Sequence, residues 1–247
     1  MPAGIKIENL SFSYSPGKRV LNSVSLEVRP GEKFGIIGPS GSGKSTLLLH
    51  LNGVLMGEGK VTIGETVVTT KTLPVIRRLV GLVFQNPDDQ LFNPTVEEDV
   101  AFGPLNFGLS REEVRSRVTE ALASLNLAGF ENLTSHHLSL GERKRVALAT
   151  VLAMKPEIVA FDEPFSNLDP SMVLQLMEVI KSMDSTQVIV SQSVLPVIAI
   201  CDRMAILKDG AIAAIGAPLD LAKDKELMKA SGLDLGFYCE ICRRLNS

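Results

Sequence analysis

The chain has 247 residues, of which 45% are hydrophobic and 21% are charged, and its formal net charge is −3. This composition excludes a disordered chain, no apolar run is long enough to span a membrane, and the mild acidity offers no general field for gathering nucleic acid. The first residues lack the features of a secretory signal and three cysteines argue against a disulfide scaffold, so we expect a soluble cytosolic protein.

The N-terminal third predicts mainly strands. Alternating apolar residues indicate strands over 5–14 and 20–28, and the short apolar run at 33–38 is typical of a buried parallel strand. Three further elements are expected in this part of the chain, a helix over 44–55 and strands near 60–63 and 79–84.

A mostly helical insert is predicted at about 86–155. Residues 86–104 hold prolines and other strand breakers around isolated apolar residues, and no helix or strand is assigned to them. Amphipathic helices are expected over 111–125 and 140–154. The insert therefore interrupts a chain that otherwise alternates between strands and helices.

The alternation resumes after the insert. The predicted elements are strands at 158–161, 187–191, 203–207 and 211–215 and helices at 170–183 and 194–200. Strands that alternate with helices imply parallel pairing with right-handed crossovers. Residues 226–247 look helical and amphipathic, which suits a tail used for packing or dimer contact.

A glycine-rich motif lies between a predicted buried strand and a predicted helix. Residues 38–45, Gly-Pro-Ser-Gly-Ser-Gly-Lys-Ser, match the spacing G-x-x-x-x-G-K-[ST]. Such glycines let consecutive backbone N–H groups converge on phosphate oxygens, while the lysine reaches the β and γ phosphates and the serine hydroxyl binds Mg²⁺. The alternative is a glycine-rich turn without a ligand. The predicted nucleotide-binding residues here are Gly38, Pro39, Ser40, Gly41, Ser42, Gly43, Lys44, Ser45 and Thr46.

Two adjacent carboxylates follow the apolar run at 158–161. Asp162 and Glu163 stand where a buried strand ends, and buried carboxylates are costly unless ions or hydrogen bonds compensate them. Ligands of open parallel sheets bind at this end of the strands. We interpret Asp162 as a Mg²⁺ partner and Glu163 as the base that polarises an attacking water. The alternative is a strand end capped by solvated acids.

Further motifs lie between and after these two. Residues 138–142 read Leu-Ser-Leu-Gly-Glu, residues 166–169 read Ser-Asn-Leu-Asp, and Gln85 follows a predicted strand. Over about residues 4–225 the chain resembles an ABC-type ATPase. The segments LLLHLNG at 47–53, VFQNPDDQLFNPTVEEDVAFGPLN at 83–106 and HHLS at 136–139 resemble the ATPase subunits of energy-coupling-factor importers, which take up cobalt, nickel or vitamins.

The resemblance implies an α/β fold of the P-loop NTPase kind. It would have a mostly parallel sheet with helices on both faces, an antiparallel β edge and the inserted helical subdomain. Residues 1–225 would form the nucleotide-binding domain and 226–247 the C-terminal tail. The implied ligands are ATP and Mg²⁺, and the implied partners are a second ATPase subunit, identical or not, and separate integral-membrane subunits, with no nucleic acid.

The resemblance also implies residue roles that compete with simpler ones. Tyr14 would stack on adenine or merely cover a strand, and Gln85 would contact Mg²⁺ and link the nucleotide to the membrane partner. Five residues would face the nucleotide held by a second subunit, although Ser139 with Glu142, and Asp169 with Pro170, also read as helix caps. These five are Ser139, Leu140, Gly141, Glu142 and Asp169. Five apolar residues of the insert are either core or part of a groove for a partner helix, namely Leu91, Phe92, Phe102, Pro104 and Phe107.

Two positions depart from the family pattern. Leu140 replaces a glycine, so it is either strained, if its backbone is left-handed, or helical with added bulk at the subunit contact. Gln192 stands where the family has a catalytic histidine, and glutamine cannot exchange protons near neutral pH. We expect slow hydrolysis at the site built on this chain.

The predicted function is thus the ATP-hydrolysing subunit of an energy-coupling importer, on the cytoplasmic side of the membrane. The alternatives are a low-turnover regulatory subunit of such a complex, an ABC-type ATPase outside transport, and a small-molecule kinase with the same phosphate loop. Cys239 and Cys242 form only half a zinc set, so no structural metal is expected.

Overall fold

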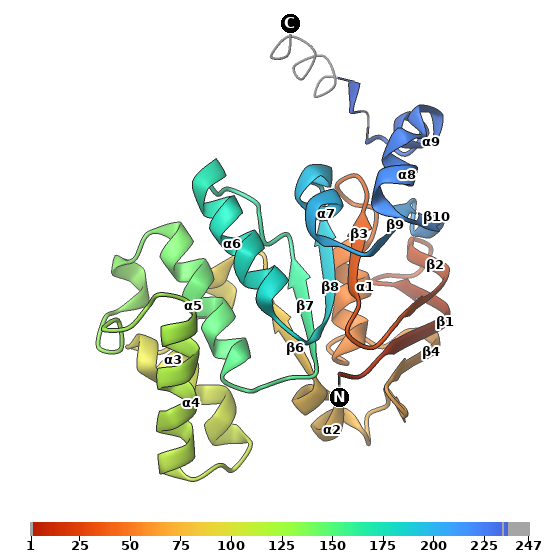
Figure 1. Cartoon of the computed structure of the whole chain (residues 1–247). Coiled ribbons are helices and arrows are strands. Elements are labelled where there is room, and N and C mark those ends of the chain that lie inside the picture. Colours follow the sequence, from red (N-terminus) through yellow and green to blue (C-terminus); the bar gives the residue numbers. More distant parts are fainter. Residues whose placement is uncertain (1, 234, 237–247) are drawn as a thin grey trace, which may run out of the picture.

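The predicted strands form two sheets (Figure 1) in a computed structural model that describes residues 2–233, 235 and 236. The smaller sheet is antiparallel and has the order β2-β1-β4-β5. Its strands are β1 (Ile5–Ser13), β2 (Arg19–Val28), β4 (Glu58–Ile63) and β5 (Thr66–Val67). This sheet is the antiparallel edge that the resemblance implied.

The larger sheet has the order β10-β9-β3-β8-β7-β6. All neighbours in it are parallel except β10, which pairs antiparallel with β9. Its strands are β3 (Lys33–Ile37), β6 (Val80–Val83), β7 (Ile158–Asp162), β8 (Thr186–Ser191), β9 (Arg203–Lys208) and β10 (Ala211–Gly216). The predicted α/β class with a mostly parallel sheet is confirmed.

Alternate residues of the parallel strands pack into two different hydrophobic clusters. In β7, Ile158 and Ala160 join the cluster that contains α1 (Lys44–Leu51), whereas Val159 and Phe161 join the cluster on the opposite face. Side chains of a strand alternate between faces, so both faces of the large sheet are covered. Helix α1 contacts β7 and β8 and also β2 and β4, so it lies between the two sheets.

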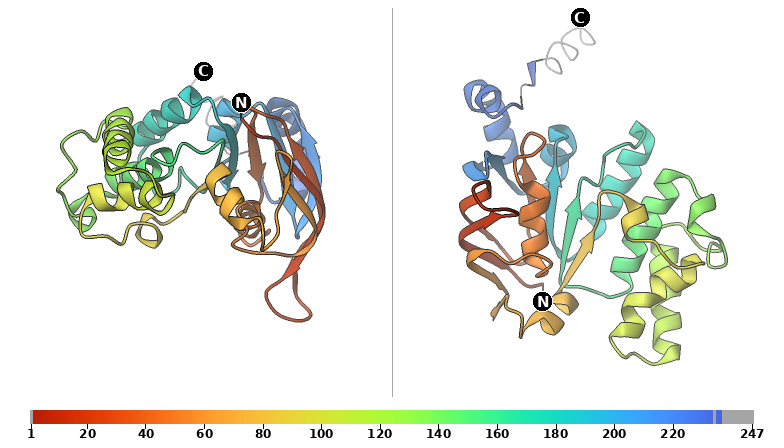
Figure 2. Two further views of the ribbon diagram at one scale, coloured as in Figure 1. Left: turned by 90° about the horizontal axis from the view of Figure 1, so that it is seen from below. Right: turned by 180° about the vertical axis from the view of Figure 1, so that it is seen from behind.

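The segment between β6 and β7 is helical and lies at one side of the molecule (Figure 2, right). Helices α3, α4 and α5 contact one another there. The elements are η1 (Pro87–Asp89), α3 (Val96–Asn106), α4 (Arg111–Ser124), η2 (Ser135–His137) and α5 (Leu140–Leu152).

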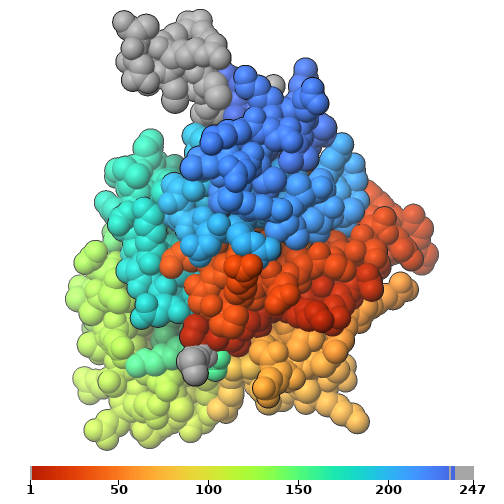
Figure 3. Space-filling model, turned by 45° about the vertical axis from the view of Figure 1, so that its right-hand side comes forward, coloured from red at the N-terminus to blue at the C-terminus, as the bar shows by residue number. Residues whose placement is uncertain are grey.

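The remaining helices are α2 (Leu73–Leu79), α6 (Pro170–Ser182), α7 (Val194–Ile200), α8 (Pro218–Lys223) and α9 (Lys225–Ala230). Figure 3 shows the N-terminal strands, in red, between the orange segment that follows them and the blue C-terminal helices. Within the described residues, no helix is long and apolar enough to cross a membrane. Most of the predicted tail, including Cys239 and Cys242, lies outside those residues.

The structure differs from the sequence predictions at several elements. The helix expected over 44–55 ends at Leu51, because Asn52 caps it and Gly53 has a φ of +69° that a helix cannot continue. The sequence predictions also lack helices α2, α3 and α8 and the short strand β5. The start of α3 is a capping box in which Thr95 and Glu98 bond each other's backbone N–H groups, and the prolines around it obscured that signal.

Candidate functional site

The glycine-rich loop at 38–46 connects β3 to α1. Gly43 has a φ of +102°, a backbone conformation that residues with an L side chain rarely adopt. A Cβ on Gly38 would collide with the carbonyl oxygen of Leu207. The chain therefore needs glycine at both positions. Lys44 Nζ donates hydrogen bonds to the carbonyl oxygens of Gly38 at 2.9 Å and Pro39 at 3.1 Å, so its ammonium lies inside the loop.

Strand order brings the acidic residues to this loop. Because β8 lies between β3 and β7, the carboxyl ends of these three strands meet at one edge of the sheet. Ser45 Oγ donates a hydrogen bond to Asp162 Oδ1 at 2.9 Å, although the two residues are 117 positions apart. The loop and the acidic strand end thus form one site.

Glu163 is held rigidly beside the loop. Its backbone is left-handed, with φ of 45°, and its N–H donates to the Val190 carbonyl at 3.0 Å. Its Oε2 accepts hydrogen bonds from Ser191 Oγ at 3.3 Å and from the Gln192 backbone N–H at 3.0 Å. Its Oε1 is buried, has no hydrogen-bond partner among the described residues, and lies 3.7 Å from Lys44 Nζ. One oxygen therefore fixes the carboxylate and the other faces the lysine.

Burial dominates the electrostatics of the site. It lowers the pKa of Lys44, and the charges of Glu163 and Asp162 oppose that shift. It also raises the pKa of Asp162, against the hydrogen bond from Ser45. Both shifts arise because burial removes water from these charged groups. A bound polyanion or cation would therefore interact with them with little competition from solvent.

The predicted signature residues begin α5. Ser139 and Glu142 form the expected capping box, in which Glu142 Oε2 accepts from the Ser139 N–H at 2.8 Å and from its hydroxyl at 2.6 Å. Leu140 is the first residue of the helix, so the alternative of a strained left-handed leucine is excluded. Gly141 is buried, and a Cβ there would collide with the end of the Met172 side chain.

Asp169 and Tyr14 have local partners. Asp169 caps α6, and its Oδ1 accepts from the backbone N–H groups of Ser171 at 2.9 Å and Met172 at 3.0 Å. Tyr14 follows β1, is 62% exposed, and its hydroxyl lies 3.2 Å from Thr46 Oγ1. The tyrosine side chain is therefore exposed beside the end of the glycine-rich loop.

The two predicted glutamines are exposed. Gln85 follows the carboxyl end of β6, and Gln192 follows that of β8. Only the backbone of Gln192 contacts Glu163 in the bonds described above. His50, by contrast, packs in the core: its Nδ1 lies 2.7 Å from the Thr46 carbonyl oxygen, and burial lowers its pKa.

Three residues that shape the site belong to no sequence motif. Ser191 holds Glu163, as described above. Gln90 accepts a hydrogen bond from the Phe84 N–H at 3.0 Å and donates to the Ala147 carbonyl of α5 at 2.7 Å. Lys144 of α5 is buried against the turn that follows Glu163. Lysine and glutamine are usually exposed, so only the tertiary structure reveals these contacts.

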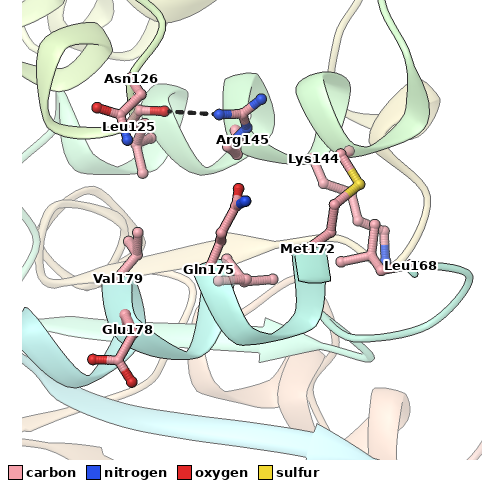
Figure 4. Close-up of a pocket in the computed structure, with 11 residues that line it drawn as sticks. Leu125, Asn126, Lys144, Arg145, Leu168, Met172, Gln175, Glu178 and Val179 are labelled. Atoms are coloured by element: carbon pink, nitrogen blue, oxygen red, sulfur yellow. Dashed lines mark hydrogen bonds between the residues drawn. The ribbon is translucent and has the colours of Figure 1, made fainter. Parts of the chain in front are cut away.

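A cavity of about 300 Å³ lies between α5 and α6 (Figure 4). Lys144 and Arg145 approach it from α5, and Met172, Gln175 and Val179 approach it from α6. None of the residues of the glycine-rich loop lines it. It is therefore separate from the site formed by the loop and the acidic strand end. Among the described residues, no group of three or more His, Cys, Asp or Glu side chains is arranged to hold a metal ion.

A glycine-rich loop that faces an acidic strand end defines a P-loop nucleotide hydrolase. Residues 21–166 match the family described as ABC transporter, and the chain belongs to this family. The protein is accordingly an ABC transporter ATPase, whose ATP hydrolysis is coupled to transport.

Its relatives include ATPases of energy-coupling-factor transporters. The chain is 45% identical to the energy-coupling factor transporter ATP-binding protein EcfA of Methanothermobacter thermautotrophicus, over 98% of this chain and 79% of that protein. The structure of cbiO1 from Clostridium perfringens, part of the ABC transporter complex cbiONQ, matches with a TM-score of 0.83 and 32% identity, over 98% of this chain and all of that chain. The predicted resemblance to this kind of ATPase is confirmed.

A second solved structure shows the cassette as a dimer. The ATP-binding cassette MJ0796, in a dimeric post-hydrolysis state bound to ADP and Pi, matches with a TM-score of 0.78 and 32% identity. The match covers 87% of this chain and 98% of that chain.

Proposed function

We propose that this chain is the ATP-binding and ATP-hydrolysing subunit of an energy-coupling-factor importer for a transition metal ion, cobalt or nickel, or for a vitamin. The observation that carries the hydrolytic part is the hydrogen bond between Ser45 and Asp162, with Glu163 beside it. The likeness to EcfA and cbiO1 supports the importer class. The chain would act as a peripheral subunit on the cytoplasmic side of the membrane, with a nucleotide-binding domain over 1–225 and its helical subdomain at about 86–155.

The loop at 38–46 binds the phosphates of ATP in this proposal. Its backbone N–H groups and the ammonium of Lys44 supply donors, and the start of α1 adds its positive end. The Ser45 hydroxyl and the Asp162 carboxylate are hard oxygen ligands 2.9 Å apart, a donor set that fits Mg²⁺, and Gln85 would add an amide oxygen. Bound Mg²⁺ would neutralise charge on the phosphates.

Glu163 is the proposed general base. Its Oε2 is already engaged by Ser191 and by the Gln192 N–H, so Oε1 is the oxygen that can accept a proton from an attacking water. The left-handed backbone and the two hydrogen bonds fix the direction in which Oε1 points. A base held in this way contributes typically ~10²–10⁴-fold to the rate.

A second ATPase subunit, identical or not, completes the site in this proposal. Ser139, Leu140, Gly141 and Glu142 at the start of α5, together with Asp169, would face the nucleotide held by that subunit. The dimeric state of MJ0796 with ADP and Pi supports such pairing. Helical Leu140 would then add an apolar side chain at this contact.

Part of the helical segment offers a surface for the membrane subunits. The rings of Phe92 and Phe102 are exposed and meet edge to face, with centroids 5.0 Å apart, and Leu105 is exposed nearby on α3. Leu91 and Pro104 are buried instead and belong to the core. We propose that the exposed residues receive a helix of a membrane partner, because an unpartnered aromatic pair is costly in water.

Replacing Tyr14 with alanine should weaken ATP binding. If its exposed ring stacks on adenine, removing it costs about 1–3 kcal/mol, and the KM for ATP rises by roughly fivefold or more. Steady-state kinetics of the assembled complex would measure the change. Tyr14→Phe is the matched control, since it keeps the ring and removes only the hydroxyl near Thr46. An equal rise in KM for both variants would contradict stacking.

A low-turnover regulatory subunit is the second candidate, because Gln192 stands where ABC-type ATPases have a catalytic histidine. Gln192→His should raise steady-state turnover several-fold, since an imidazole can exchange protons near neutral pH. The hydrogen bond to Glu163 comes from the backbone of residue 192, so the base keeps its position in this variant. Gln192→Ala serves as the control for loss of the amide. An unchanged or lower rate with histidine would count against a slowed site.

Purification of the native complex tests the proposed function as a whole. Co-isolated subunits should include a second ATPase and at least one multi-span membrane protein. Vesicles that contain the complex should then accumulate radiolabelled cobalt, nickel or a vitamin only when ATP is supplied on the side of this subunit. Isolation with ribosomes or nucleic acid, and without membrane subunits, would favour an ABC ATPase outside transport.

A further inference from the structure

Lys144 carries a buried ammonium on the second turn of α5. The residue is only 8% exposed. Its Nζ donates hydrogen bonds to the carbonyl oxygens of Ser166 at 2.7 Å, Pro164 at 3.0 Å and Glu163 at 3.4 Å, and to Ser166 Oγ at 3.2 Å. One side chain of the helical segment therefore binds the whole turn at 163–166, which begins with the proposed base.

This turn is strained and internally bonded. Glu163, its first residue, and Asn167, the residue directly after it, both have positive φ, of 45° and 58°. Ser166 donates to the Glu163 carbonyl from its N–H at 3.2 Å and from its hydroxyl at 2.9 Å. Non-glycine residues persist in left-handed conformations only when their surroundings hold them there. Lys144 supplies that support from α5.

Burying the Lys144 ammonium against this turn costs desolvation free energy, so the contact is a poor way to gain stability alone. Burial lowers the pKa of Lys144 to about 8, and the Glu163 charge partly opposes this shift. The ammonium donates its hydrogen bonds to carbonyl oxygens and is not directly paired with a carboxylate. A buried charge is generally no more stabilising than apolar packing of the same volume, so this lysine serves the geometry of the turn.

We propose that Lys144 is a positioning residue that couples the start of α5 to the catalytic base. Ser139, five residues before Lys144, caps the N-terminus of the same helix. When Ser139 engages the nucleotide of the second subunit, α5 and the turn at 163–166 move as one body, and Glu163 Oε1 is directed at the attacking water. The inference rests on the proposed roles of Glu163 and Ser139, and it adds the residue that connects them.

Lys144→Met in the assembled complex tests the proposal. Methionine keeps an unbranched side chain of nearly the same length and removes its donors. We expect kcat to fall by about tenfold or more, because small displacements of a base are costly. The KM for ATP and the affinity for a fluorescent ATP analogue should stay within roughly threefold. Lys181→Met on α6, at an exposed lysine, is the matched control. Lys144→Gln, which restores one amide donor, should recover part of kcat.

A double-variant cycle separates positioning from a structural role. In the Glu163→Gln background, Lys144→Met should reduce the residual turnover by much less than in the wild type, because effects that act through one group are not additive. Unchanged kcat in Lys144→Met, or an equal reduction in both backgrounds, would overturn the proposal. A loss of kcat that matches a loss of ATP binding or of folded protein in both Lys144 variants would overturn it as well. Wild-type turnover of Glu163→Gln alone would refute the proposed base and, with it, this coupling.

Discussion

Lys44→Ala is expected to lose most of its ATP affinity and nearly all of its turnover. The ammonium now bonds the carbonyls of Gly38 and Pro39 inside the loop and lies 3.7 Å from Glu163 Oε1. Each charge-assisted hydrogen bond to phosphate contributes about 1.5–3 kcal/mol, so affinity should fall by roughly tenfold or more. The additional loss of charge stabilisation in the transition state makes the effect on turnover larger.

Equilibrium binding of a fluorescent ATP analogue and steady-state turnover measure these losses. Removing Lys44 also leaves a buried carboxylate unpaired, so the thermal unfolding midpoint must be measured in parallel. Lys60→Ala, at an exposed position of β4, is the matched control and should change neither binding nor turnover. A Lys44→Ala protein that binds ATP as tightly as the wild type would refute the nucleotide site.

Glu163→Gln is expected to separate binding from hydrolysis. The amide oxygen can still accept from Ser191 and from the Gln192 N–H, so the side chain remains in place while its basicity is lost. Turnover should fall by about 10²–10⁴-fold, while ATP binding is retained. Since ATP persists, the paired subunits should also stay closed for longer.

Single-turnover hydrolysis and size-exclusion chromatography with ATP measure the two consequences. Glu178→Gln on α6, whose side chain is exposed, is the control for the same chemical change away from the site. Turnover close to that of the wild type in Glu163→Gln would show that another group activates the water, and the proposed mechanism would be wrong.

Local patterns were sufficient to predict most of the fold. Strands such as β7 and β8 are short apolar runs bounded by polar residues, and α4 and α5 have clear helical spacing. Helix α3 is not predicted, although its capping box at Thr95 has the same form as the one at Ser139. Proline usually ends or breaks a helix, yet Pro104 lies within α3, close to its end.

The site was predictable only where the residues are contiguous. The loop at 38–46 and the pair Asp162 and Glu163 stand out in the sequence because each forms a motif. The hydrogen bonds from Ser191 and Gln192 to Glu163 depend on β8 lying beside β7, which no local pattern specifies. The burial of Lys144 likewise depends on how α5 packs against the turn after β7.

The carboxylate of Glu163 is tethered by the main chain of position 192, whereas the side chain at that position points outward and is exposed. A substitution at 192 therefore leaves this hydrogen bond to the base in place, because every amino acid except proline has the same backbone N–H. Two ATPase subunits that differ at this position could therefore turn over at different rates while the base of each keeps the same backbone hydrogen bond.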